Sequence, residues 1–130
     1  MIFNFSLKED GETKITQNFQ VKEFACKDGS DKIRISNHVI YGLQDIRNYI
    51  HKPIKIISGY RTEEYNRSID GAENSYHCKG MACDIQVEDM NIYELGMIAS
   101  HCRFNGVIVY PKKNFIHVDI RDNYYFKVVE

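Results

Sequence analysis

The chain of 130 residues contains no tryptophan, only two prolines and almost no net charge. Its 17 basic and 18 acidic side chains give a formal charge of −1, so the charge balance does not favour nucleic acid or an anionic membrane as a partner. The sequence has no run of about 18 consecutive apolar residues, and we therefore expect no membrane span.

Two further absences concern export and thiol chemistry. The first ten residues lack the basic start, the long apolar stretch and the small-residue cleavage site of a secretory signal. We therefore expect synthesis in the cytoplasm, so that a substrate outside the cell would be met only after release or export. No two of the four cysteines form a C-x-x-C pair, which argues against a cysteine-rich zinc site and favours reduced thiols.

The length and composition are those of one folded domain. Hydrophobic residues make up 43% and charged residues 27% of the chain, as in an ordinary globular protein. A chain of this length can bury a core without help from disulfides or metals. We expect a single domain over 1–130, with 1–16 as a peripheral N-terminal segment, and a monomer.

Local patterns predict helices and strands in alternation. Ser36 resembles an N-cap, and apolar residues at helical spacing then predict a helix over 37–50 that ends before Pro53. Asn91 is expected to cap a second long helix, which Asn105-Gly106 would end in the left-handed conformation.

Shorter elements lie between and after these two helices. Thr62 is expected to cap a short helix that runs to about Ile69. Short apolar runs predict strands over 54–57, 82–87, 107–110, 115–120 and 124–129. The third and fourth of these strands would form an antiparallel hairpin across Pro111 to Asn114. The sum is an α+β fold, with a mainly antiparallel sheet and two longer helices packed on it.

His77, Asp84 and His117 are the candidate ligands of one zinc ion. Two imidazoles and a carboxylate can bind zinc and leave a fourth position open, as hydrolytic zinc sites do. On one helix, residues seven apart would be separated by about 10 Å along the axis. His77 and Asp84 can therefore share an ion only if the chain turns back between them, and Gly80 is placed for such a turn.

Three more side chains are candidates for a role beside the metal. Asp119 and His117 lie two apart on a strand and project to the same side. Asp119 is therefore expected either to accept the proton of the attacking water or to orient a metal ligand. Arg61 follows a turn at a strand end and could bind a substrate carboxylate, and Tyr110, at the hairpin, could donate to an oxyanion.

The other chemically active residues have simpler interpretations. His38, His51 and His101 fall near helix ends and are expected to be surface or structural groups. Cys78 and Cys83 flank the candidate ligands, where either could bind a metal, but we interpret them as small packing residues.

The motifs around these residues resemble the zinc D-Ala-D-Ala carboxypeptidase and L-alanyl-D-glutamate endopeptidase family, which has the hedgehog-like metallopeptidase fold. The family pattern S-x-H-x-x-G-x-A-x-D is filled at every fixed position from Ser75 to Asp84. Supporting motifs are Ser58-Gly59-Tyr60-Arg61-Thr62, the pair Tyr110-Pro111, and Phe115-Ile116-His117-Val118-Asp119. The similarity covers roughly residues 17–121.

The resemblance implies one zinc ion on His77, Asp84 and His117 and hydrolysis of peptide bonds in the peptidoglycan stem. It also implies that Arg61 binds a carboxylate of the substrate, and we expect Ser75 and Tyr110 to be the other substrate-binding residues. Domains of this family occur in cell-wall enzymes and in bacteriophage lysins and virion proteins. A peptidoglycan peptide is therefore the expected partner, and the cell wall is the expected place of action, reached after release or export.

The sequence departs from the family at one position that matters for catalysis. Many members carry a glutamate general base three residues before the last histidine ligand, where this chain has Asn114. Others place a histidine two residues before it, where this chain has Phe115. Asp119 is then the expected base. If it is not, the chain is an inactive zinc-binding module of the cell wall or of a phage virion. A metal-free globule is the third alternative.

Overall fold

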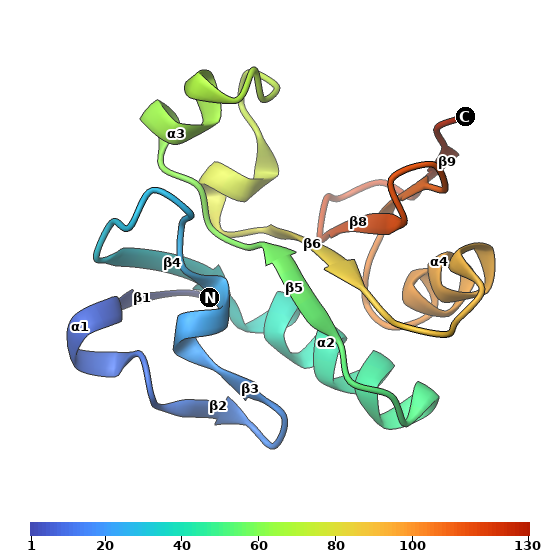
Figure 1. The fold of residues 1–130 in the computed structure, drawn as a ribbon, viewed down its shortest axis with the longest axis horizontal. Coiled ribbons are helices and arrows are strands. Elements are labelled where there is room, and N and C mark those ends of the chain that lie inside the picture. Colours follow the sequence, from blue (N-terminus) through green and yellow to red (C-terminus); the bar gives the residue numbers. More distant parts are fainter.

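The computed structural model describes all 130 residues, which form nine strands, four α-helices and two 3-10 helices (Figure 1). The strands are β1 (Ile2–Ser6), β2 (Lys14–Thr16), β3 (Phe19–Gln20), β4 (Lys32–Ser36), β5 (Lys55–Ser58), β6 (Ala82–Gln86), β7 (Gly106–Tyr110), β8 (Phe115–Asp119) and β9 (Tyr125–Val128). The helices are α1 (Leu7–Asp10), η1 (Val21–Phe24), α2 (Asn37–Ile50), α3 (Glu63–Ser68), η2 (Tyr76–Lys79) and α4 (Ile92–Ser100). None of them has the length and hydrophobicity needed to cross a bilayer.

The main sheet has five strands in the order β5-β6-β8-β7-β9. All neighbours in it are antiparallel except β7 and β9, which run parallel. Helix α4 contacts β7 and β8, and Figure 1 shows α2 running beneath β5. This arrangement confirms the predicted α+β fold with a mainly antiparallel sheet and two longer helices.

The N-terminal part of the chain forms two small antiparallel sheets at one end of the molecule (Figure 1). Strand β1 pairs with β4 over its whole length, and β2 pairs with β3. Phe3, Phe5 and Leu7 pack against the hydrophobic core. The segment 1–16 therefore contributes a paired strand and apolar contacts to the fold.

The two faces of the main sheet have different compositions. Alternate residues of β6, β7 and β8 are fully buried and belong to one core with the inner faces of α2 and α4; they are Cys83, Ile85, Val107, Val109, Ile116 and Val118. Because successive side chains of a strand point to opposite faces, Asp84, Ile108 and His117 lie together on the other face. Burial of the apolar residues on one face thus aligns Asp84 and His117 side by side on the other face.

The predicted starts of the two long helices are confirmed. The Ser36 hydroxyl accepts the backbone N–H of His38 at 3.1 Å, and the Asn91 side chain caps α4 in the same way. Helix α2 ends where His51 adopts a left-handed conformation, with φ at 56°, two residues before Pro53.

The predicted end of the second long helix is wrong. Helix α4 stops at Ser100, and Gly106 begins β7 instead of closing the helix. The left-handed residue of this connection is Arg103, with φ at 76°. The chain leaves the helix early because Phe104, which is 1% exposed, turns inward to fill the core.

Gly80 forms the turn that brings the two halves of the His77–Asp84 segment together. Its φ is 73°, which glycine adopts without strain, and it ends η2. A Cβ atom there would lie 2.8 Å from the backbone carbonyl of Arg34. The Gly80 carbonyl also accepts the Ser36 N–H at 2.8 Å, so the turn is fixed against β4.

We expect Gly80→Ala to lower the free energy of unfolding by about 2–5 kcal/mol, because the left-handed conformation and the backbone overlap both cost energy. Gly29→Ala is the matched control, since Gly29 also has a positive φ but no atom near its missing Cβ. That control should lose only about 1–2 kcal/mol. Denaturant unfolding measures both values, and equal losses would show that contact with Arg34 does not constrain the turn.

Candidate metal centre

The three predicted metal ligands come from two strands of the sheet and one short helix. Asp84 on β6 and His117 on β8 are directly opposite each other in antiparallel register. His77 reaches the same point from η2, whose start is capped by the Ser75 hydroxyl accepting the His77 N–H at 3.2 Å. One atom from each of His77, Asp84 and His117 lies within 4.8 Å of the other two.

The His77 ring is held by a backbone contact from a distant segment. Its Nδ1 lies 2.9 Å from the Gly59 carbonyl oxygen and therefore donates to it. The other ring nitrogen, Nε2, faces Asp84 Oδ1 at 3.2 Å. His77 is 3% exposed, so in the neutral ring the lone pair of Nε2 points into the site.

The His117 ring is held in the opposite sense by a carboxylate. Its Nε2 lies 2.7 Å from Asp119 Oδ2 and donates to it. Its Nδ1 faces Asp84 Oδ1 at 3.0 Å. The two imidazoles therefore present one nitrogen each to the same oxygen atom of Asp84.

The chemistry of this donor set fits a metal cation. Each imidazole donates a hydrogen bond through the ring nitrogen that points away from Asp84. The other ring nitrogen can then offer a lone pair toward the Asp84 carboxylate oxygen. Such a group of acceptors needs either protons or a cation between its members. Two imidazoles and one carboxylate are ligands that zinc commonly takes. No cysteine belongs to the group, and the Cys83 side chain lies in the core.

The pKa shifts at the site follow from the same contacts. Burial opposes ionisation of Asp84, but when protons rather than a cation lie between the rings and the carboxylate, the hydrogen bonds from His117 and His77 hold the pKa of its carboxyl well below the usual range. Burial would lower the pKa of His117, yet its hydrogen bonds to Asp119 and Asp84 outweigh burial and raise it. Asp84 is therefore ionised at neutral pH and available as a ligand.

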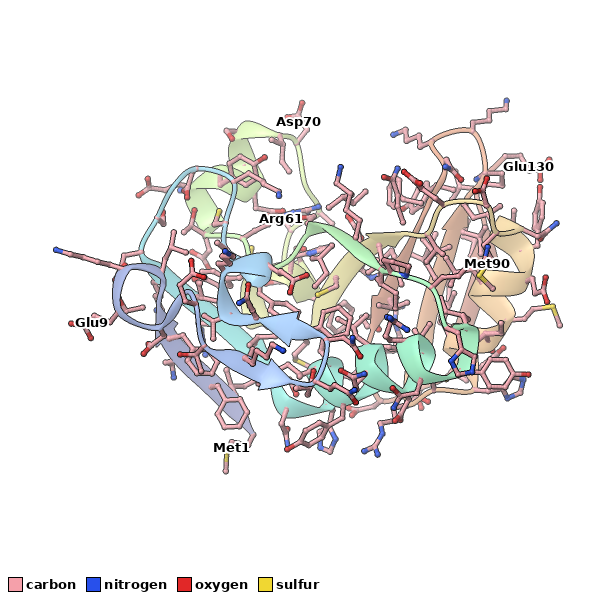
Figure 2. The ribbon with its side chains drawn as sticks, turned by 60° about the horizontal axis from the view of Figure 1, so that its bottom comes forward. Met1, Glu9, Arg61, Asp70, Met90 and Glu130 are labelled. Atoms are coloured by element: carbon pink, nitrogen blue, oxygen red, sulfur yellow. The ribbon has the colours of Figure 1, made fainter.

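The three side chains line a cleft of about 490 Å³. Its lining comes from the main sheet and the β7–β8 hairpin, from the segment 69–77, and from Arg61 and Arg121. Figure 2 shows Asp70 at the outer tip of that segment and Arg61 nearer the centre of the molecule. A hollow of about 530 Å³ beside Lys52 and Glu88 contains no histidine. The cleft of about 490 Å³ is therefore the candidate site, because it contains the three candidate metal ligands.

Arg61 lies in the cleft and is held on three sides. Its guanidinium donates to Ser58 Oγ at 3.1 Å, to Asn66 Oδ1 at 3.2 Å and to Asp84 Oδ2 at 3.4 Å. A guanidinium has five N–H donors, so two are left for another acceptor. Its side chain is 15% exposed, which leaves it accessible from the cleft but restricted in movement.

Asp119 lies behind His117, on the side away from Asp84. Its side chain is fully buried, and it accepts two hydrogen bonds from the Arg121 guanidinium at 2.8 and 2.6 Å. Burial would raise the pKa of Asp119, but the hydrogen bonds from Arg121 and His117 hold it well below its usual range. This position suits the orientation of a ligand, one of the two roles considered from the sequence, better than proton transfer at the open side of the site.

The remaining predicted residues lie around the cleft. Tyr110 lines it and stacks on Phe115, with ring centroids 4.6 Å apart, and burial raises the pKa of its hydroxyl. Ser75 also lines the cleft, although its hydroxyl is engaged in capping η2. Asn114 is exposed in the hairpin turn, with φ at 54°, and does not line the cleft.

Two residues of the site were missed by the sequence analysis. Arg121 pairs with Asp119, and the buried Asn66 accepts from Arg61. The Asp-x-Arg spacing could have indicated the role of Arg121, because an aspartate often accepts the backbone N–H two residues later. Here the Arg121 N–H donates to Asp119 at 3.1 Å. His38, His51 and His101 are exposed and lie outside the site, as expected.

Comparison with known proteins agrees with this geometry. The sequence model of the Peptidase M15 family matches residues 15–119. The peptidoglycan L,D-endopeptidase MepK of Escherichia coli (strain K12) is 38% identical over 85 residues, which are 62% of this chain and 46% of that protein. The probable peptidoglycan L,D-endopeptidase MepK of Haemophilus influenzae is 36% identical over 84 residues, which are 61% of this chain and 45% of that protein.

The aligned part thus spans about half the length of the curated relatives. The family match, in contrast, takes in most of the chain and all three converging side chains. It confirms the resemblance inferred from the motifs: the protein belongs to the Peptidase M15 family.

Proposed function

We propose that this protein is a zinc-dependent peptidase that hydrolyses peptide bonds in the peptide stems of peptidoglycan. The observation that carries the proposal is the convergence of His77, Asp84 and His117 in a cleft that also contains Arg61. Membership of a peptidase family supports the reaction, and the name of the MepK relatives, peptidoglycan L,D-endopeptidase, supports the substrate class.

Each residue has a distinct task in this proposal. His77, Asp84 and His117 would hold zinc, which when bound polarises a carbonyl group and makes water more acidic. Arg61 binds a carboxylate of the stem peptide through its two remaining N–H donors and so fixes which peptide bond lies at the metal. The Tyr110 hydroxyl is protonated at neutral pH, like any tyrosine, and burial raises its pKa further, so it can donate to a developing oxyanion.

We assign Asp119 to the orientation of His117. The carboxylate holds the Nε2–H of the ring, which leaves Nδ1 free to bind the metal. The proton of the attacking water must then go to a carboxylate that faces the cleft. Apart from Asp84, the acidic residues that line it are Asp70 and Glu73. Asp70 lies at the outer tip of its segment, which leaves Glu73 as the candidate for the general base that Asn114 does not supply.

The charges of the site favour an anionic substrate. The carboxylates Asp84 and Asp119 are paired with Arg61 and Arg121, so a divalent cation would leave the site positive. Stem peptides of the D-Ala-D-Ala and L-alanyl-D-glutamate types carry free carboxylates, which match such a field. Lys113 at the rim of the cleft adds to it.

A second candidate function is a zinc-containing module that binds the cell wall, or forms part of a phage virion, without turnover. Two observations favour it. Asn114 stands where many relatives are expected to carry a base, and both oxygen atoms of Asp119 are engaged by Arg121 and His117. Such a module would bind stem peptides in the same cleft and release no products.

The protein is expected to bind one zinc ion per chain, and His77→Ala and Asp84→Asn should each abolish this binding because two remaining ligands hold zinc weakly. At a free zinc concentration of 100 times Kd, the ion should stabilise the wild type by about 2.7 kcal/mol. Elemental analysis after dialysis and thermal unfolding measure the two effects. His101→Ala is the control and should bind normally. Undiminished zinc in His77→Ala would place the ion elsewhere.

Zinc-loaded protein is expected to cleave defined stem peptides, and a chelator should stop the reaction until zinc is restored. Mass spectrometry of the products identifies the bond that is cut and whether cleavage occurs at an end or internally. Saturable binding of the peptides with no products in any metal state would contradict the peptidase proposal and support the non-catalytic module.

Arg61→Lys should lower kcat/KM about 10–100-fold for a stem peptide with a free carboxylate, because a charge-assisted hydrogen bond contributes about 1.5–3 kcal/mol. Zinc content should be checked in parallel, since Arg61 also contacts Asp84. For the same peptide with its carboxylate converted to an amide, Arg61→Lys should lower kcat/KM much less. Arg67→Lys, an exposed arginine on α3, is the matched control. A loss of the same size on both peptides would contradict carboxylate binding by Arg61.

A further inference from the structure

The buried Asp119 carboxylate is held at two points by Arg121, which lines the cleft. The Arg121 guanidinium donates through Nε to Asp119 Oδ1 at 2.8 Å and through its terminal nitrogen to Oδ2 at 2.6 Å. The Arg121 backbone N–H donates to Oδ1 at 3.1 Å. This two-point contact fixes the plane of the carboxylate as well as its position.

Two tyrosines hold the guanidinium from other elements. It lies 5.0 Å from the centre of the Tyr76 ring and 4.6 Å from that of Tyr125. Tyr76 is the neighbour of His77 on η2, and Tyr125 begins β9. Cation–π contacts at these distances are favourable and restrict the arginine rotamer. Arg121 thus connects the end of β8 to the helix that carries one metal ligand.

The backbone around the pair is shaped to receive it. Gly106 on β7 is opposite Asp119 in the sheet, and a Cβ atom there would lie 2.0 Å from Asp119 Oδ1 and 2.5 Å from Arg121 Nε. The ion pair therefore occupies the space that any larger residue would fill. Asn105 donates from its side chain to the Arg121 carbonyl at 2.9 Å, which fixes the chain after β8.

We propose that Arg121 is a positioning residue for the metal site and acts on His117 through Asp119. With its carboxylate plane fixed by Arg121, Asp119 holds the His117 Nε2–H, so that Nδ1 is directed at the metal position. Without Arg121, the fully buried Asp119 would lose its positive partner and its orientation. The inference rests on the proposed zinc site, and it assigns a role to a residue that contacts neither the ion nor its ligands.

Zinc affinity is the quantity that tests this role, because Arg121 also borders the cleft and an activity assay would mix positioning with substrate contact. Competition with a chromophoric chelator, in the absence of substrate, should show Arg121→Gln binding zinc about 10–100 times more weakly than the wild type. Arg121→Lys keeps the positive charge but cannot make the two-point contact, so its zinc affinity should lie between those of the wild type and Arg121→Gln. The absorption spectrum of bound Co²⁺ should change in both variants, since it reports ligand geometry.

The matched control is Arg103→Gln. Arg103 also pairs with an aspartate, Asp45 at 2.7 Å, and lies 5.7 Å from the ring centre of Tyr41, but it does not line the cleft. It should leave zinc affinity and the Co²⁺ spectrum unchanged. Thermal unfolding of the metal-free proteins shows whether each variant is folded. If Arg121→Gln does not fold, Arg121→Lys is used to test the role of Arg121.

A double-mutant cycle with Asp119→Asn identifies the route of the effect. If Arg121 acts through Asp119, then Arg121→Gln should weaken zinc binding little further in the Asp119→Asn background. The same loss in both backgrounds, or zinc affinity of Arg121→Gln within twofold of the wild type, would overturn the proposed role. Absence of zinc from the wild type would overturn the proposed function itself, which distinguishes the two failures.

Discussion

The geometry of the candidate metal centre depends on the hydrogen-bond acceptor that lies on the far side of each imidazole. Nδ1 of His77 donates to the Gly59 carbonyl and Nε2 of His117 donates to Asp119, and these contacts turn the two remaining ring nitrogens toward one oxygen of Asp84. The nitrogen that faces Asp84 is Nε2 in His77 and Nδ1 in His117. The two histidines can therefore reach the same oxygen although one lies on η2 and the other on β8. The partners behind the ligands thus select which nitrogen is free, which is how such partners tune metal sites in general.

The hydrophobic core supplies the geometry that these contacts refine. Asp84 and His117 face each other across β6 and β8, while their neighbours Ile85 and Val118 are fully buried on the opposite face. A shift of one residue in the register would expose the apolar side chains and bury the ligands. The free energy of burying the core therefore also enforces the ligand pairing, and the metal is not needed to bring these two side chains together.

Much of this could be predicted from local sequence. Asn91 and the periodicity of 37–50 gave correct helix starts, and Gly80 marked the turn between His77 and Asp84. The contacts that were missed join distant segments: the pairing of β1 with β4, and the Gly59 carbonyl behind His77, 18 residues away. Alternation placed Asp119 on the side of His117, but it does not say which ring nitrogen Asp119 meets or that Arg121 pairs with it.

Each buried carboxylate of the site is paired with a positive charge. Asp84 and Asp119 are buried carboxylates, and each is matched by an arginine, as the cost of an unpaired buried charge requires. The two pairs differ in strength. Arg121 grips Asp119 with two short bonds, whereas the contact of Arg61 with Asp84, at 3.4 Å, is the longest of its three. The two imidazole nitrogens face Oδ1 of Asp84, whereas Arg61 contacts Oδ2 of the same carboxylate. One carboxylate can therefore serve the candidate metal position and Arg61 together, because each uses a different oxygen atom and an ionised carboxylate accepts at both.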